Sequence, residues 1–311
     1  MDLNAKMDNT QNINNGMTFY FGDDVLGIGK IGSAFIEKLC HCIGKIYTLY
    51  NYDKIEEQRL ASAKADSEIQ IIKATANEKE KDIRLSHQIW RRIELEQLLK
   101  QHNLSNVVSR ANNLVDDARV NDEEIDLDWL LKFIKAAEDT TSEDLQDLLA
   151  QILADEVATP GKYSSRLINF VRNTDKKELE LFYRFMSISS DIALYHMGND
   201  FKPVTLTKYG LNTYDLVTLD SLGLIQNSRG LSVITDIDNT GSTNIIFNHY
   251  RIFLSCTEKR HVELGVYPLT TLGQELASIS KKYIKNSKDS EYTKDLLQYF
   301  SDMNISAQIS E

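Results

Sequence analysis

The sequence predicts a mainly helical protein that ends in a smaller α+β domain. Only 3 prolines occur in 311 residues, so long helices are possible. Up to about residue 200, apolar residues recur at spacings of three and four, which is typical of amphipathic helices. Runs of β-branched and aromatic residues appear only after Pro203. We therefore expect long N-terminal helices and an antiparallel helical bundle, followed by the α+β domain.

The expected organisation has five parts. Residues 1–22 are polar and Asn-rich, and we interpret them as a flexible N-terminus. The other parts are an amphipathic helix with a long charged helix (23–101), a helical bundle (102–200), the α+β domain (201–285), and a C-terminal helix and tail (286–311).

Composition narrows the function classes. The content of 42% hydrophobic residues is enough to build cores, and the net charge of −11 disfavours binding to the phosphate backbone of nucleic acids. The cysteines (Cys40, Cys42 and Cys256) do not form a disulfide framework and suit a reducing cytoplasm. An apolar signal core and a spanning segment are both missing from the sequence, which predicts a cytoplasmic location, with the periphery of the inner membrane as the alternative.

A glycine triplet near the N-terminus resembles a dinucleotide-binding motif. Gly27, Gly29 and Gly32 have the order G-x-G-x-x-G, and Asp53 follows about twenty residues later. Such a site needs parallel strands on both sides of a helix. Residues 17–29 can supply the first strand, but residues 53–101 read as one charged helix, and we expect no further strand before about Val204. The sequence therefore predicts no cofactor site here.

Residues 28–50 predict an amphipathic helix whose apolar stripe has three possible uses. The stripe packs on the chain's own core, assembles with another copy, or lies in a membrane interface, so a membrane contact through residues 25–50 stays open. The stripe residues that we assign to interaction are Ile28, Ile31, Phe35, Leu39 and Ile43.

The charged helix expected over residues 53–101 carries a thin heptad seam. Several seam positions are Ala or Ser, so the seam stabilises a long helix poorly unless another chain, or another part of this chain, covers it. Self-association and packing on the rest of the protein are both open. The seam residues that we assign to assembly are Ile69, Ile72, Ile83 and Trp90.

Start and stop signals divide the bundle region into short helices. Asp126 is a candidate N-cap, and Thr140 with Glu143 has the spacing of a capping box. Pro160 and Gly161 stop one helix, and Ser164 or Ser165 can cap the next.

The segment 126–166 resembles an uncharacterised bacterial family of domains of unknown function. Its members share a D-W-x-x-x-F helix, an L-L-A-x-E helix and a P-G-x-x-S-x-R turn. Weaker patterns are similar to the alpha family of abortive-infection proteins, which implies a role in bacterial defence against phage. The resemblance implies no catalytic residue. The matching positions are Trp129, Phe133, Glu156, Pro160, Gly161, Ser164 and Arg166.

Glu156 and Arg166 flank the Pro160–Gly161 turn, and we expect them to form an ion pair that closes it. The alternative is that Arg166 presents its charge to a partner.

The last third looks like a winged-helix module, with short strands that follow a helix over residues 213–222. That helix carries Asp215 and Asp220 and neither Lys nor Arg, so repulsion from phosphates disfavours DNA binding. We expect contact with a protein instead.

The sequence predicts no metal site and shows no local catalytic motif, although a hydrolase site assembled from distant residues stays open. The histidines are scattered, and no pair has the spacing of metal ligands. The most consistent hypothesis is a non-enzymatic protein that binds copies of itself and another protein, without a small-molecule substrate. A winged-helix DNA-binding regulator and a membrane-associated effector are the alternatives.

Overall fold

The structure is a computed structural model that describes residues 33–49, 80–197, 203–228, 231–241 and 243–310. Within these ranges the chain is mainly helical, as the sequence predicts, and its C-terminal part contains two small antiparallel sheets. No helix among the described residues is long and apolar enough to cross a bilayer. The N-terminal segment 1–22, the glycine triplet, and the side chains of Ile28, Ile31, Ile69, Ile72 and Ile83 lie outside the description.

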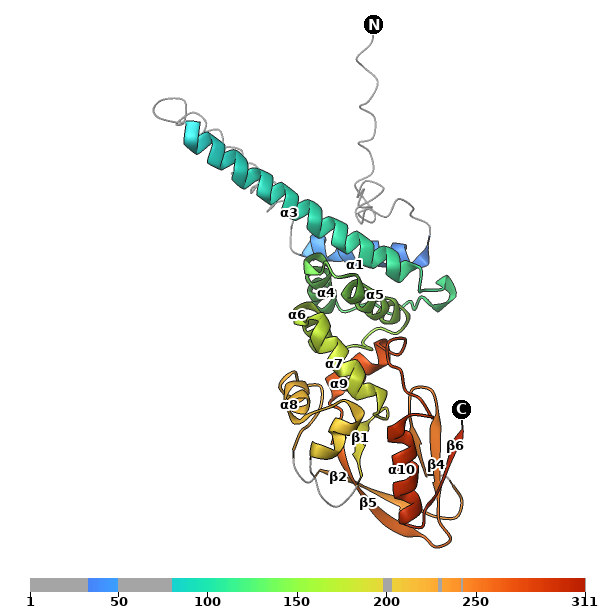
Figure 1. Cartoon of the computed structure of the whole chain (residues 1–311). Coiled ribbons are helices and arrows are strands. Elements are labelled where there is room, and N and C mark those ends of the chain that lie inside the picture. The colour runs from blue at the N-terminus through green and yellow to red at the C-terminus, as the bar shows by residue number, and fades with distance from the viewer. Residues whose placement is uncertain (1–32, 50–79, 198–202, 229–230, 242, 311) are drawn as a thin grey trace.

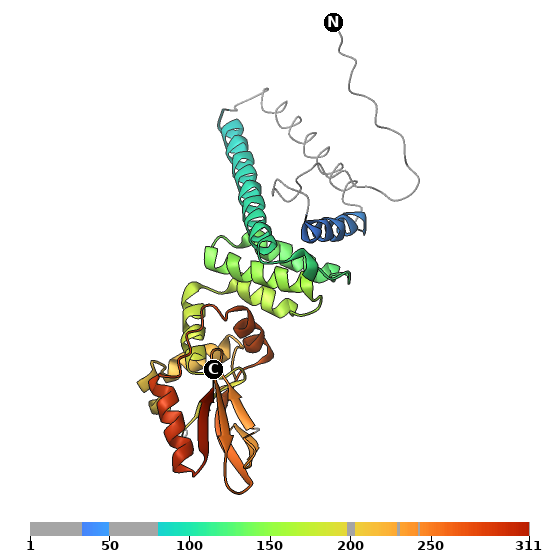
Figure 2. The ribbon, with the colours of Figure 1, turned by 90° about the vertical axis from the view of Figure 1, so that its right-hand side faces the viewer.

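The bundle lies in the middle of the molecule, and one long helix projects from it (Figures 1 and 2). The end of α3 packs on α4 and α5, and α4 packs on α6. The part of α3 nearest its N-terminus extends away from the body (Figure 1). The helices are α1 (Ala34–Leu49), α3 (Glu80–Asn112), α4 (Leu127–Asp139), α5 (Glu143–Ala158), α6 (Ser165–Asn173) and α7 (Lys176–Ser187).

Helix α3 is longer at its C-terminal end than the sequence predicts. We expected a break near residue 101, but the helix continues to Asn112 because Leu104, Val107 and Val108 bury its last turns in the bundle. The expected boundary between assembly region and bundle therefore falls inside one helix.

The caps are partly as predicted. The Asp126 carboxylate accepts a hydrogen bond from the Trp129 N–H at 2.7 Å, which confirms it as the N-cap of α4. The capping box at Thr140 is wrong. Helix α5 begins at Glu143 after Ser142, and the Thr140 hydroxyl donates to the Ala136 carbonyl at the end of α4.

The C-terminal part combines two three-stranded sheets with short helices. One sheet has the order β1-β5-β2 and the other β3-β4-β6, and all paired strands are antiparallel. The elements are β1 (Ala193–His196), α8 (Thr213–Ser221), β2 (Ser232–Ile237), β3 (Thr243–Ile246), β4 (Arg251–Ser255), β5 (Arg260–Pro268), α9 (Thr271–Ile279), α10 (Glu291–Asp302) and β6 (Ser306–Ser310).

Two strands contradict the sequence-based expectation. Strand β1 precedes Val204, and β6 lies in the region where we expected a helix and a tail. Both strands depend on distant partners. The Tyr292 hydroxyl of α10 bonds the backbone of Tyr195 in β1, and β6 pairs with β4.

Candidate functional site

The residues of the family-like signature meet at the turn between α5 and α6. Helix α5 ends at Ala158, and Gly161 adopts a φ of +79°, which glycine reaches without steric cost. The Ser164 hydroxyl then accepts a hydrogen bond from the Leu167 N–H and caps α6. Proline and glycine thus end one helix where the next begins.

Glu156 holds this turn closed from inside the bundle. Its side chain is only 1% exposed, and its carboxylate accepts hydrogen bonds from the backbone N–H groups of Gly161 (2.7 Å) and Tyr163 (3.4 Å). Burial raises the pKa of Glu156, and these backbone donors oppose the shift. The expected ion pair with Arg166 is therefore wrong. Arg166 is exposed and forms no ion pair with any residue that the structure describes.

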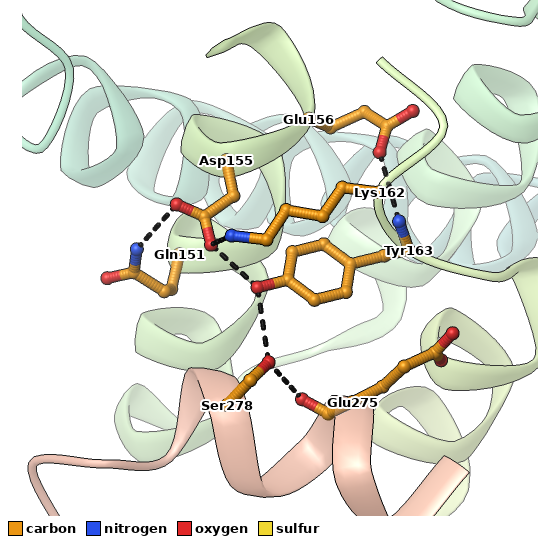
Figure 3. Close-up of polar contacts among 7 residues, drawn as sticks. All are labelled: Gln151, Asp155, Glu156, Lys162, Tyr163, Glu275 and Ser278. Carbon is orange, nitrogen blue, oxygen red and sulfur yellow. Dashed lines mark hydrogen bonds and ion pairs between the residues drawn. The ribbon is translucent and has the colours of Figure 1, made fainter. Parts of the chain in front are cut away.

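Tyr163 connects the turn to its surroundings (Figure 3). Its carbonyl accepts a hydrogen bond from the Trp129 indole at 2.9 Å, and its hydroxyl donates to Asp155 at 2.6 Å. The hydroxyl also lies 3.4 Å from the Ser278 hydroxyl of α9. Burial, followed by the bond to Asp155, raises the pKa of Tyr163, so the phenol stays protonated and remains a donor.

Asp155 is surrounded by donors in the same view. Besides the Tyr163 hydroxyl, it accepts from the Lys162 ammonium at 2.7 Å and from the Gln151 amide at 3.1 Å (Figure 3). These three donors hold the Asp155 carboxylate in place between the turn and α5.

Helix α9 completes the site from the C-terminal domain. The Glu275 carboxylate accepts from the Ser164 hydroxyl at 2.7 Å and from the Ser164 N–H at 3.3 Å. On its other side α9 approaches the chain closely, since a Cβ atom on Gly273 would lie 2.1 Å from the Leu224 carbonyl oxygen. We call the set Asp155, Glu156, Tyr163, Ser164, Glu275 and Ser278 the junction cluster.

The junction cluster is only partly visible in the sequence. The signature contributes Glu156 and Ser164, and Trp129 supports the turn while its ring stacks on Phe133 at 5.4 Å between centroids. Tyr163 lies within the signature segment but is not one of the matching positions. Glu275 and Ser278 are more than a hundred residues away and carry no local motif, so the sequence gives no signal for them.

The comparison with family models identifies this region. The model described as "Protein of unknown function (DUF2806)" matches residues 87–297, which include the junction cluster and both sides of it. The chain belongs to the DUF2806 family. This membership confirms the expectation of an uncharacterised family. Neither the search of curated proteins nor that of solved structures returned a match to this DUF2806 chain.

The described residues assigned to assembly in α1 pack inside the DUF2806 chain itself. Phe35, Leu39 and Ile43 are buried, which corresponds to the first of the three uses open to this stripe. Helix α1 is fixed at both faces. The Ser33 hydroxyl donates to the Asn112 side chain at 2.7 Å, and the Lys38 ammonium donates to the carbonyl oxygens of Asn121 and Val157.

The projecting part of α3 has an apolar face that no described residue covers. At the C-terminal end of the helix, Leu104, Val107, Val108 and Ala111 are buried on one face. With a rotation of about 100° per residue, the same face continues toward the N-terminus. There its apolar side chains are between 40% and 55% exposed. We call this set, Leu85, Ile89, Trp90 and Ile93, the α3 stripe.

The described residues offer no alternative site of metal chemistry. They contain no group of three His, Cys, Asp or Glu side chains placed to hold a metal ion. The arrangement can therefore fix two parts of the chain to each other and display an apolar helix face.

Proposed function

We propose that this protein is a non-enzymatic scaffold that self-associates through the α3 stripe. The observation that carries the proposal is that the buried face of α3 continues, exposed, for about three turns beyond the bundle. The junction cluster has the complementary role, because it fixes the C-terminal domain to the bundle from which α3 projects.

The energy of apolar burial supports this function. Burying a Leu or Ile side chain contributes about 1.5–3 kcal/mol, so partial burial of the stripe can drive weak to moderate association. A helix without tertiary cover is also marginally stable in water. Pairing with the α3 stripe of a second copy supplies the missing contacts and produces a symmetric interface.

A winged-helix DNA-binding regulator has less support. The β1-β5-β2 order beside α8 favours a winged-helix likeness. However, α8 exposes Tyr214 and Val217 together with Asp220, and it contains neither Lys nor Arg. This face suits a protein surface better than a phosphate backbone.

A membrane-associated effector also has less support than self-association. The apolar side chains of α1 that would enter a bilayer interface, Phe35, Leu39 and Ile43, are occupied in the protein core.

The biological context that we propose is defence against phage. It rests on the resemblance of the signature to abortive-infection proteins. We expect cells that express the protein to reduce phage plaque numbers, and cells that express an α3 stripe variant to lose this effect. Equal plaque numbers with and without the protein would contradict the proposed context.

The native mass of the full chain, measured by light scattering, tests self-association. The Ile89→Gln/Ile93→Gln variant keeps helix-forming residues but removes apolar surface, so we expect its mass to be lower than that of the wild type. Val217→Gln removes an exposed apolar side chain from α8 and is the matched control, which should keep the wild-type mass. A wild type of monomeric mass at all concentrations would contradict the proposal.

A further inference from the structure

Strand β2 presents an open sheet edge on the C-terminal domain. It pairs with β5 along its whole length, and its other edge pairs with no strand among the residues that the structure describes. Natural sheets usually protect such an edge with Lys, Pro, a bulge or a covering segment. The sequence of β2, S-V-I-T-D-I, contains neither Lys nor Pro, its one charged residue is Asp236 near its end, and its central Ile234 is 70% exposed.

The register identifies which backbone groups point outward. The Leu231 carbonyl accepts from the Val266 N–H at 2.9 Å, so the hydrogen-bonded positions facing β5 are 231, 233, 235 and 237. The N–H and C=O groups of Ser232, Ile234 and Asp236 therefore point away from β5. In agreement, the Asp236 carbonyl accepts a hydrogen bond from the Thr243 hydroxyl on that side. Thr243 therefore lies against the outer edge of β2 at its Asp236 end.

We infer that this edge binds the β2 edge of a second copy, in an antiparallel pair centred on Ile234. About that two-fold axis Ile234 lies opposite the partner's Ile234, and Ser232 lies opposite the partner's Asp236. The central contact is therefore apolar on both sides, while the Ser232 hydroxyl remains bonded to Glu263 of its own chain. Ile234 exchanges both of its backbone hydrogen bonds with its counterpart, and Thr243 bounds the contact at the Asp236 end.

The charge on β2 is also compatible with pairing to the β2 edge of a second copy. Asp236 is already paired with Lys259 (2.9 Å) and His261 on the neighbouring strand, so no uncompensated acid enters the contact. The pairing extends each three-stranded sheet across the two-fold axis. This second surface extends the proposed self-association but does not depend on the α3 stripe.

Substitutions at Ile234 test the edge by light scattering on the full chain, in the wild type and in the Ile89→Gln/Ile93→Gln background. Ile234→Glu places two carboxylates opposite each other across the contact, and each of them lies beside Glu263 of β5 in its own copy. Ile234→Pro removes only an outward N–H, which an edge strand tolerates. We expect each variant to have about half the mass of the protein without the Ile234 substitution, in both backgrounds. The reason is that loss of one two-fold contact divides the assembly into two equal parts. Ile192→Glu, at an exposed apolar position outside β2, should keep the parent mass.

Charge reversal tests the register directly. Mixing Ile234→Glu with Ile234→Lys places opposite charges together, and we expect the parent mass to return. Masses unchanged by Ile234→Glu and Ile234→Pro in both backgrounds, or no recovery on mixing, would overturn the inference. An effect of Ile234→Glu without any effect of the α3 substitutions would leave the edge contact standing and refute the function proposed for α3.

Discussion

At the residue scale, Glu156 shows how a buried charge can be structural. Its carboxylate satisfies two backbone N–H groups of a turn that cannot continue as a helix, and no described cation forms an ion pair with it. Hydrogen bonds to a charged acceptor are stronger than neutral ones, so these backbone donors offset part of the burial cost that raises the pKa of Glu156.

Removing the carboxylate should weaken the fold. Glu156→Ala leaves the N–H groups of Gly161 and Tyr163 without their acceptor, and an unsatisfied buried donor costs about 1–3 kcal/mol. We expect a loss of that size in the free energy of unfolding, measured by urea denaturation. Asp128→Ala, at an exposed acid paired only with Lys132 on α4, is the control and should have little effect. Equal stability of the Glu156→Ala variant and the wild type would contradict this role.

The raised pKa of Glu156 predicts a pH dependence of stability. Below its ordinary pKa of 4.5 the group is protonated in both states. Between that value and the raised pKa of the folded state, only the folded protein holds the proton, so stability falls as pH rises. Glu156→Gln should lose this part of the pH dependence. Parallel stability profiles of the variant and the wild type from pH 4 to pH 8 would contradict the assignment.

The sequence predicts the residues of this turn better than their partners. Pro160, Gly161 and Ser164 have local roles that follow from backbone conformation alone. The partner of Glu156 was wrongly assigned, because opposite charges near a turn suggest an ion pair while the actual donors are backbone groups that every sequence contains.

At the element scale, α9 connects the two halves of the described chain. One face contacts the turn through Glu275 and Ser278, and the other brings Gly273 against the Leu224 backbone. A side chain at position 273 would force these elements apart.

Gly273→Ala should therefore destabilise the protein. The added Cβ would meet a backbone carbonyl oxygen, which cannot rotate away, so we expect a loss of about 1–3 kcal/mol or more from overpacking. Gln274→Ala, at the adjacent exposed position of α9, is the matched control and should be nearly neutral. Thermal unfolding of both variants checks the prediction, and equal midpoints would contradict the close approach.

Elements with strong local signals were predicted, and elements that depend on distant pairing were not. The buried faces of α4, α5 and α7 follow from apolar periodicity and are confirmed. Strand β1 has only 4 residues, and β6 is largely polar, so neither shows a pattern until its partner is known. The expected capping box at Thr140 does not form, because the Thr140 hydroxyl instead donates a hydrogen bond to the Ala136 carbonyl at the end of α4.

At the scale of the whole molecule, the arrangement separates a fixed body from an exposed helix. The junction cluster ties the C-terminal domain to the bundle, while the α3 stripe extends beyond it (Figure 1). The small residues in the heptad seam predict that the long helix needs another chain, or another part of this chain, to pack against it. The sequence could not predict that α1 packs inside the protein, because an apolar stripe does not reveal its partner.

The exposure of Trp90 tests the central claim most directly. The chain has 2 tryptophans, and Trp129 is only 5% exposed, so Trp90 should supply the iodide-quenchable fluorescence of the free chain. We measure quenching and native mass over a dilution series of the Ile234→Glu variant, in which the β2 contact is removed, with Trp90→Phe in the same background as the control. If α3 stripes pair, quenching should increase as the mass falls on dilution, and the control should not change. Quenching that stays constant while the mass falls, or protection of Trp90 in a monomer, would contradict self-association through α3.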